Sequence, residues 1–428
     1  MNLSNVGQQW MARNSDFFQC EWIANPDPQW LKRQWMALEA RAEPNLFLSW
    51  LWIGTWLDCF VDDYYVVLTR NDDTTVGLGI IVVKEKKLAT LNVGRQFCLH
   101  RTGDPLMDQI WIEYNDFLLD STVAALVRPL MTACVMANMK GTDTFVVGAS
   151  EALDFLGYAV AETGTLAVNG VYGTDTLMVL ADGSVVQPER EVVWDSTAYR
   201  LDFSPLREEN QTLDRYLSRN ARYQIKRSLK KYQALGTLKI TTASSVTQGL
   251  HFFEHAAEYH LKRWGCSPHQ SGFANPNFLH FHQELIRRGF PKGQVAIHHF
   301  QAGEHDLGVI YNFHYDHWVH FYLSALNYEA PAPCVNAKGN EEANGANGDR
   351  HLKPGLVAHY LLIEDAMAKG FAGYDFMGGQ SRYKQTFANQ TVGLSVYHYR
   401  FPHVVYAMKK VIRGLKRRVW SQSSSDCP

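Results

Sequence analysis

The chain has 428 residues, of which 46% are hydrophobic, and its formal net charge is -2. This nearly neutral balance disfavours nucleic acid and anionic membranes as main partners, and the length predicts two domains of about 100–200 residues each. The seven cysteines contain no CxxC pair, a pattern typical of reduced thiols, so we expect a cytoplasmic protein. The sequence shows no apolar signal segment and no run of about 18 apolar residues, so neither export nor a membrane-spanning helix is expected.

The first half, residues 1–200, is predicted to be one domain that begins with an irregular, tryptophan-rich arm. Hydrophobic periodicity and turn residues indicate its helices and strands. In chain order they are helices at 29–41 and 46–60, strands at 64–69, 76–83, near 88–93 and at 109–118, a helix at about 121–138 and a strand at 145–148. The apolar helix at 46–60 is too short to span a membrane comfortably, which favours a buried position in the core.

The second half, residues 201–403, is predicted to begin with a helix at 217–235 that carries six basic residues. The next predicted elements are helices at about 247–263 and 276–288 and antiparallel strands at 294–300, 307–313 and 318–325. Residues 330–350 are rich in Pro, Asn and Gly and predict a flexible loop, whereas residues 404–428 predict a basic helix and a frayed tail. Both halves therefore share the order helix, antiparallel strands, helix, strand, without a repeat at the level of residues.

The most informative stretch, residues 352–384, predicts a helix between two strands. Pro354 suits the first helical position and Gly370 the end of the helix, and apolar residues recur between them at helical spacing. Strands at 318–325 and 374–377 flank this helix, which predicts a βαβ crossover with parallel strands. The backbone N–H groups at such a helix start form an anion site, to which Lys353 adds charge and Gly355 a close backbone approach.

Titratable residues within and after this helix are candidates for chemistry. His359 lies on the apolar face and could act as a general base, although a histidine there is more often a hydrogen-bonded core residue. Asp375 lies in the following strand, where it could deprotonate an amine, orient His359 or simply be paired. Tyr383 could protonate a leaving thiolate, and the ammonium of Lys384 could bind a phosphate or a carboxylate; otherwise the two only begin a surface helix.

The run PGLVAHYLLIEDAMAKG, followed by YDFMGG and RYK, resembles the tandem GNAT-like acyltransferases. This group includes the BioF2-like proteins and the cellulose-biosynthesis-associated acetyltransferases, and it is related to the Fem transferases. The stretch IEYNDFL at 112–118 and the basic helix around RNARYQIKRSLKK look similar as well. The resemblance implies an α/β fold of the mixed-sheet kind, with two tandem GNAT-like domains. It also implies transfer of an acyl group from acyl-CoA, such as acetyl-CoA, to an amine or hydroxyl of a small-molecule or cell-envelope-precursor acceptor.

The resemblance and the expected junction of two domains extend the set of candidate site residues beyond the helix and strand described above. Among these additional candidates are the polar residues at 113–116, which could instead form only the solvated face of the predicted strand. The donor would be held by Tyr322, Ser324, Lys353, Gly355 and Lys384, with backbone N–H groups of 322–324 stabilising the oxyanion. The acceptor would be bound by Tyr114, Asn115, Gly378 and Gly379, and the catalytic candidates are Glu113, His359, Asp375 and Tyr383.

Two other functions remain open at this point. The basic residues at 219–231 favour a Fem-like transferase that takes its donor from aminoacyl-tRNA, although they equally suit a solvated helix face. A non-catalytic binding module with a GNAT-like fold is the third possibility. We expect no DNA partner, and no metal site, because the histidines between 298 and 320 occupy both faces of the strands without recurring acidic or cysteine partners. The basic helix at the C-terminal end predicts a peripheral contact with the inner face of the membrane.

Overall fold

The structure is a computed structural model that describes residues 18–88, 91–152, 155–156, 158–162, 165–169, 178–179, 185–186, 188–329 and 353–402. These residues form two compact units. The first contains the described residues up to Asp108, those of Ile112–Asp195 and those from Ser395 onward, and the second contains Gln109–Trp111 and Ser196–Leu394. The sequence-based boundary at 200/201 lies close to the change of unit at 195/196. The loop predicted at 330–350 and the basic helix predicted at 404–428 lie outside the described residues.

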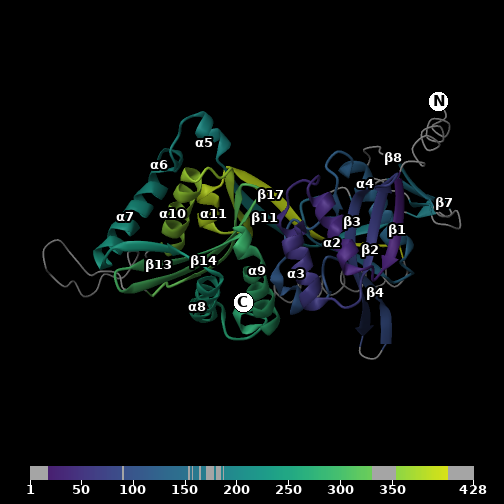
Figure 1. Cartoon of the computed structure of the whole chain (residues 1–428), viewed down its shortest axis with the longest axis horizontal. Helices are drawn as coiled ribbons and strands as arrows, with labels where there is room; N and C mark the ends of the chain where they lie inside the picture. Colours follow the sequence, from purple (N-terminus) through teal and green to yellow (C-terminus); the bar gives the residue numbers. More distant parts are fainter. Residues whose placement is uncertain are drawn as a thin grey trace, which may run out of the picture. The chain divides into compact units, whose positions relative to one another are not determined.

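The first unit contains a mixed sheet covered by helices (Figure 1). Its sheet follows the order β1-β2-β3-β4-β6, in which every neighbouring pair is antiparallel except the parallel pair β4 and β6. The described elements are β1 (Phe18–Ala24), α2 (Pro28–Glu39), α3 (Trp50–Phe60), β2 (Tyr65–Asn71), β3 (Thr74–Leu88), β4 (Leu91–Leu99), β5 (Leu118–Leu119), α4 (Ala124–Ala137), β6 (Thr144–Ser150), β7 (Tyr158–Glu162), β8 (Thr165–Asn169), β9 (Met178–Val179) and β10 (Val185–Val186).

The second unit repeats this topology. Its sheet has the order β11-β16-β15-β14-β13-β12, and only the pair β15 and β16 is parallel. The described elements are β11 (Glu189–Asp202), α5 (Ser204–Glu208), α6 (Leu213–Tyr216), α7 (Arg219–Leu235), β12 (Leu238–Thr242), α8 (Val246–Trp264), α9 (Pro276–Gly289), β13 (Val295–Ala302), β14 (His305–Tyr315), β15 (Trp318–Leu326), α10 (Pro354–Ala368), β16 (Gly373–Gly378), α11 (Arg382–Phe387) and β17 (Gln390–Arg400). The strands β11 and β17 each contain residues of both units.

Both units therefore contain a strand, two helices, three antiparallel strands, a helix and a strand parallel to the last of the three. This confirms the predicted mixed α/β class and the predicted repetition of architecture. The helix at 46–60 is also confirmed as buried core, since it is α3 preceded by a 3-10 turn at Leu46–Leu48, and Trp52 and Trp56 are almost fully buried.

Two expectations about local structure were wrong, and one strand was not predicted. Phe18–Ala24 is not irregular, because its residues pair in register with Tyr65–Asn71. Residues 109–118 are not a strand: Trp111 and Tyr114 have φ values of 45° and 51°, which a strand does not allow, and only Leu118–Leu119 pairs with a neighbour. The edge strand β12 escaped the sequence analysis because Leu238–Thr242 is short and only partly buried.

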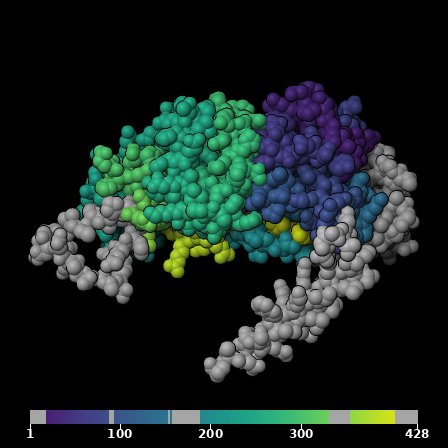
Figure 2. Space-filling view, turned by 90° about the horizontal axis from the view of Figure 1, so that it is seen from below, coloured from purple at the N-terminus to yellow at the C-terminus, as the bar shows by residue number. Residues whose placement is uncertain are grey.

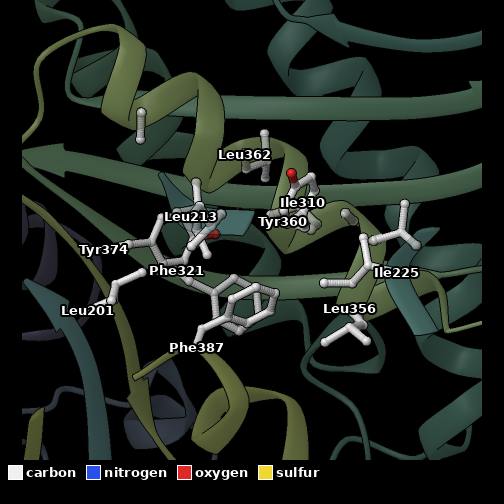
Figure 3. Packing of buried hydrophobic residues seen from close by; sticks show 14 of the residues in the cluster. Leu201, Leu213, Ile225, Ile310, Phe321, Leu356, Tyr360, Leu362, Tyr374 and Phe387 are labelled. Atoms are coloured by element: carbon white, nitrogen blue, oxygen red, sulfur yellow. The ribbon is translucent and has the colours of Figure 1, made fainter. Parts of the chain in front are cut away.

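Helices cover both faces of the sheet in the second unit (Figure 1). On one face, α7, α10 and α11 share a hydrophobic cluster with the strands, in which Ile225, Leu356, Phe321 and Phe387 are buried (Figure 3). On the other face, Phe253 of α8 packs against Phe278 of α9 and against Tyr311, Phe273 and His282. This second face is seen as teal and green atoms in Figure 2. Because helices cover both faces, the central strands β13 and β14 are buried along most of their length, including their histidines at 298 and 299 in part.

Candidate functional site

A cleft of about 800 Å³ opens at the start of α10. Its walls come from three helices of the second unit, α7, α10 and α11, together with Tyr328 just after β15. The residues that line it are Asn220, Tyr223, Gln224, Arg227, Ser228, Lys231, Tyr328, Lys353, Pro354, Gly355, Leu356, Arg382, Tyr383 and Thr386. The spacing 220, 224, 227 and 231 places one face of α7 along the cleft. The cleft therefore lies where the sequence predicts an anion site.

The charge of this cleft is positive. Arg227, Lys231, Lys353 and Arg382 line it, and none of the described residues in its lining is acidic. The basic residues of α7 thus divide into two groups, because Lys226 instead pairs with Asp214 at 3.0 Å outside the cleft. Several cationic side chains in one cleft are typical of a site for phosphates.

The first turn of α10 exposes backbone donors to the cleft. Pro354 occupies the start of the helix, and Lys353 at the N-cap makes no side-chain hydrogen bond to the first turn. A Cβ built on Gly355 would meet only the Cδ1 atom of Leu326, at 3.8 Å, so the backbone there faces open space. Unsatisfied N–H groups at a helix start attract anions, which agrees with the role predicted for Lys353 and Gly355.

The strands β15 and β16 separate near the same helix. They pair in parallel only from Trp318 opposite Gly373 to His320 opposite Asp375, although β15 continues to Leu326. A β-bulge places Tyr322 between two residues that pair with β14, which changes the direction of the backbone at this point. The candidates Tyr322 and Ser324 lie in this separated part of β15. The hydroxyl of Tyr322 itself donates to the carbonyl of Ile110 at 2.7 Å, so only its backbone suits the predicted role.

Of the four predicted catalytic residues, Tyr383 is the one that lines the cleft. Its ring stacks on His359 with the centroids 4.9 Å apart and an angle of 8° between the planes. Burial raises the pKa of Tyr383 above its ordinary value, so the hydroxyl stays protonated at neutral pH. Lys384 points elsewhere: it is buried and donates to the carbonyls of Met377 and Gly378, which gives its ammonium a role in holding the end of β16.

His359 is fully buried, as predicted from the apolar face of its helix, and its Nδ1 atom lies 3.0 Å from the hydroxyl of Tyr374. Burial, and to a lesser extent the charge of Lys384, lowers the pKa of His359 to about 3. A base with so low a pKa is almost unable to hold a proton taken from an ammonium at neutral pH. The geometry therefore favours the core alternative for His359 over the general base.

The depressed pKa of His359 makes stability depend on pH. The unfolded histidine binds a proton near pH 6.5 and the folded one only near 3, so stability falls as pH drops from about 6.5 toward 3. We expect the free energy of unfolding of His359→Gln to depend less steeply on pH in this window. The slope should be smaller than that of the wild type by about 1.4 kcal/mol per pH unit, which corresponds to one proton. Urea unfolding at several pH values measures both slopes. Replacement of the exposed His251 is the control, and equal slopes for His359→Gln and the wild type would refute the assignment.

Asp375 is buried and engaged by its neighbours. Its Oδ2 atom accepts from Nε of Arg200 at 3.0 Å, and its Oδ1 atom accepts from the backbone of Met377 at 2.7 Å. A carboxylate held in an ion pair is a poor base for an acceptor amine. Gly378 and Gly379 follow at the end of this strand, and the backbone N–H of Gly379 donates to the hydroxyl of Ser196 at 3.2 Å.

The remaining predicted residues, Glu113, Tyr114 and Asn115, belong to the first unit. Asn115 binds at both ends of its amide, since Oδ1 lies 3.0 Å from Nδ1 of His100 and Nδ2 donates to the carbonyl of Leu99 at 2.9 Å. Its backbone N–H also donates to Ala149, just beyond the parallel pairing of β4 and β6. In the first unit, Asn115 thus connects β4 to the end of β6. The corresponding strands of the second unit are β15 and β16, whose pairing ends at His320 and Asp375. The role of Asn115 is structural, and Tyr114 lines a separate cavity of about 470 Å³.

Several residues of the cleft escaped the sequence analysis as site residues. Arg227 and Lys231 were recognised only as part of a basic helix, and Tyr223, Tyr328 and Arg382 were not considered. The helical spacing of Asn220, Gln224, Arg227 and Lys231 is a signal that could have separated the cleft face from the solvated face. Tyr328 carries no such signal, because it follows the end of a strand.

Comparison with known proteins agrees with this geometry. Residues 219–338 and 339–385 match the Acetyltransferase (GNAT) domain family. This match lies within the second unit. The predicted relationship to the GNAT-like acyltransferases is thereby confirmed, and the repeated topology extends the GNAT-like arrangement to the first unit. No curated protein matches the chain.

Solved structures resemble the chain over most of its length at low identity. FemX is 10% identical, with 88% of this chain and 96% of that chain covered and a TM-score of 0.46. L-PGS from Bacillus licheniformis is 10% identical over 92% and 97% of the two chains, with a TM-score of 0.41. A tandem GNAT protein from the clavulanic acid biosynthesis pathway is 9% identical over 90% and 98%, with a TM-score of 0.35. None of the helices in the described ranges has the length and apolar character needed to cross a bilayer.

Proposed function

We propose that the GNAT domain transfers an acyl group from a coenzyme A thioester to an amine or hydroxyl of a small-molecule or cell-envelope-precursor acceptor. The observation that carries this proposal is the cleft at the start of α10. It combines the cationic side chains of Arg227, Lys231, Lys353 and Arg382 with the uncapped first turn of a helix. Such a combination suits a donor with several phosphates, as coenzyme A has.

The separated strands supply the path from the phosphates toward the reacting group. A Cβ built on Gly355 would lie 3.8 Å from the Cδ1 atom of Leu326, at the end of β15, so this strand ends near the proposed phosphate site. In this proposal the backbone N–H groups of β15 near Tyr322 and Ser324 stabilise the oxyanion, and the bulge that leaves Tyr322 unpaired with β14 supports this role. Holding donor and acceptor together there supplies the proximity that the reaction needs.

Tyr383 acts in this proposal as the acid that protonates the leaving sulfur. The carbon–sulfur bond breaks as the carbon–nitrogen bond forms, and the hydroxyl of Tyr383 donates its proton to the thiolate. The acceptor enters as the neutral amine, because Asp375 is paired with Arg200 and His359 has a pKa of about 3. Solvent then accepts the proton that the amine loses and returns a proton to the phenolate of Tyr383, which restores the acid for the next turnover.

Replacing Tyr383 by Phe is expected to lower turnover about 100-fold and to leave donor affinity unchanged, because only the proton donor is removed. Thiol release from acetyl-CoA with a panel of amines measures turnover, and calorimetry measures the affinity. Tyr360→Phe is a matched control, since the hydroxyl of Tyr360 donates to Glu364 at 2.6 Å within the same helix. Unchanged turnover in Tyr383→Phe would remove Tyr383 from the mechanism. An absence of acetyl-CoA binding to the wild type would count against the proposal as a whole.

A second candidate is a Fem-like transferase that takes its acyl group from aminoacyl-tRNA. The specific observation in its favour is that α7 carries further cations outside the cleft, of which Arg219 and Lys230 are exposed. Retention of tRNA that weakens steeply with salt would support it. If neither acetyl-CoA nor tRNA binds, the chain is a binding module with a GNAT fold.

A further inference from the structure

The face of the GNAT domain that α8 and α9 cover carries a cluster that takes no part in the proposed transfer. His255 of α8, His299 of β13 and Asp306 of β14 each direct one potential ligand atom to a common point, and these atoms lie within 4.8 Å of one another. The Nε2 atom of His299 lies 3.1 Å from Oδ1 of Asp306, and the Nε2 atom of His255 contacts Oδ2. None of the three lines the cationic cleft.

We propose that these three side chains form a binding site for a divalent transition-metal ion such as Zn²⁺. Two imidazole nitrogens and one carboxylate oxygen are a donor set that such ions prefer over Mg²⁺ or Ca²⁺. The imidazole rings stand at 85° to each other with centroids 5.3 Å apart, so they approach the carboxylate from two directions. Spacing in the sequence does not reveal this site, because His255 lies on a helix far along the chain from the histidines of the strands.

The backbone around Asp306 is shaped to direct its side chain to this point. A β-bulge interrupts the pairing of β13 and β14, so that Phe300 faces Gly308 and Gln301 faces Asp306. Gly308 has φ +108°, and a Cβ there would lie 2.2 Å from the carbonyl oxygen of Ala325, so only glycine fits. Bulges of this kind redirect side chains. The fold therefore fixes the backbone position from which Asp306 directs its side chain.

A backbone hydrogen bond also orients the carboxylate of Asp306. The backbone N–H of Gly308 donates to Oδ1 of Asp306 at 2.8 Å. Hydrogen bonds of this type hold metal ligands in place. The ligands are also accessible, since the side chains of His255 and Asp306 are 27% and 26% exposed, which leaves room for water in the remaining coordination positions.

The charge at the cluster favours a cation. Within the described ranges, no Lys or Arg pairs with Asp306, and the only ion-pair partners of its carboxylate are the two imidazoles. Metal binding requires unprotonated imidazoles, and the carboxylate of Asp306 would then give the site a negative charge that a divalent ion offsets. The ion would also tie α8 to the β13–β14 hairpin and so stabilise the folded domain.

Calorimetric titration of Zn²⁺ into the full, tag-free chain, after removal of metals by a chelator, tests the site. The protein carries Cys266→Ser, because Cys266 is an exposed thiol that could bind the same ion. We expect one equivalent of Zn²⁺ to bind and the thermal midpoint to rise. His255→Ala and His299→Gln should each weaken binding at least about tenfold, whereas His251→Ala, an exposed histidine one turn earlier on α8, should not.

Co²⁺ provides a second readout that does not depend on stability. Its ligand-field absorption should show nitrogen and oxygen ligands, and the signal should be lost in His255→Ala. Far-ultraviolet circular dichroism verifies that each variant is folded. Absence of Zn²⁺ binding to the wild type, or the same affinity and stoichiometry in folded His255→Ala and Asp306→Asn, would overturn the proposal and leave the cluster as a hydrogen-bond network. Neither result bears on acetyl-CoA binding, which involves the other face of the sheet.

Discussion

Reversal of two charges in the cleft, Lys231→Glu together with Arg382→Glu, is expected to weaken acetyl-CoA binding by about 100-fold or more. Each side chain lines the cleft from a different helix, and within the described residues neither forms an ion pair that the substitution would break. A hydrogen bond between charged groups contributes about 1.5–3 kcal/mol, and the new carboxylates would also repel phosphates. Isothermal titration calorimetry at low and high salt measures the loss.

Lys230→Glu is the matched control for this double variant. Lys230 is exposed on the same helix as Lys231 but does not line the cleft, so the reversal changes net charge without changing the site. The control should bind acetyl-CoA within about twofold of the wild type, because exposed charges outside contact distance are largely screened. Equal losses in the control and in the double variant would mean that overall charge, and not the cleft, determines binding.

Asp375→Asn is expected to lower the free energy of unfolding by about 3 kcal/mol. The substitution keeps the size of the side chain but removes the charge that partners Arg200, whose side chain is only 24% exposed. Breaking a buried ion pair leaves the remaining ion without compensation, and this desolvated charge is the source of the destabilisation. Urea unfolding measures the change.

The exposed pair of Asp365 and Lys369 provides the comparison for Asp375. Its atoms lie 2.7 Å apart, but both side chains are about half exposed, so Asp365→Asn should change stability by less than about 0.5 kcal/mol. A folded Asp375→Asn protein should still bind acetyl-CoA. Wild-type stability combined with loss of turnover would identify Asp375 as a catalytic base and contradict the structural role assigned to it here.

Much of the architecture could be predicted from sequence because its signals are local. The helix from Pro354, the parallel pair around it and the antiparallel strands before it follow from periodicity and from proline and glycine positions, and the structure confirms them. Phe18–Ala24 and Leu238–Thr242 were missed because both are edge strands whose partners lie far away in the chain. The strand predicted at 109–118 was wrong because the polar residues at 113–116 bind backbone groups in a loop and do not form the solvated face of a strand.

The candidate site could be predicted only in part, for a related reason. Lys353 and Gly355 follow from the rules for helix starts, and both line the cleft. The partners of Asp375 and Lys384 could not be predicted, because Arg200 is distant in sequence and the carbonyls that Lys384 binds are backbone groups without a residue signature. Tyr328 joins the site through tertiary packing alone, which periodicity within a single element does not reveal.

The most direct measurement is a crystal structure of the full chain with a non-reactive analogue of acetyl-CoA. The proposed function predicts that the pyrophosphate lies at the backbone N–H groups that follow Pro354, with Lys231 and Arg382 as its cationic partners and the thioester between β15 and β16. The hydroxyl of Tyr383 should lie within hydrogen-bonding distance of the sulfur position. An analogue bound elsewhere on the chain, or a cleft that stays empty at saturating analogue, would contradict the proposal.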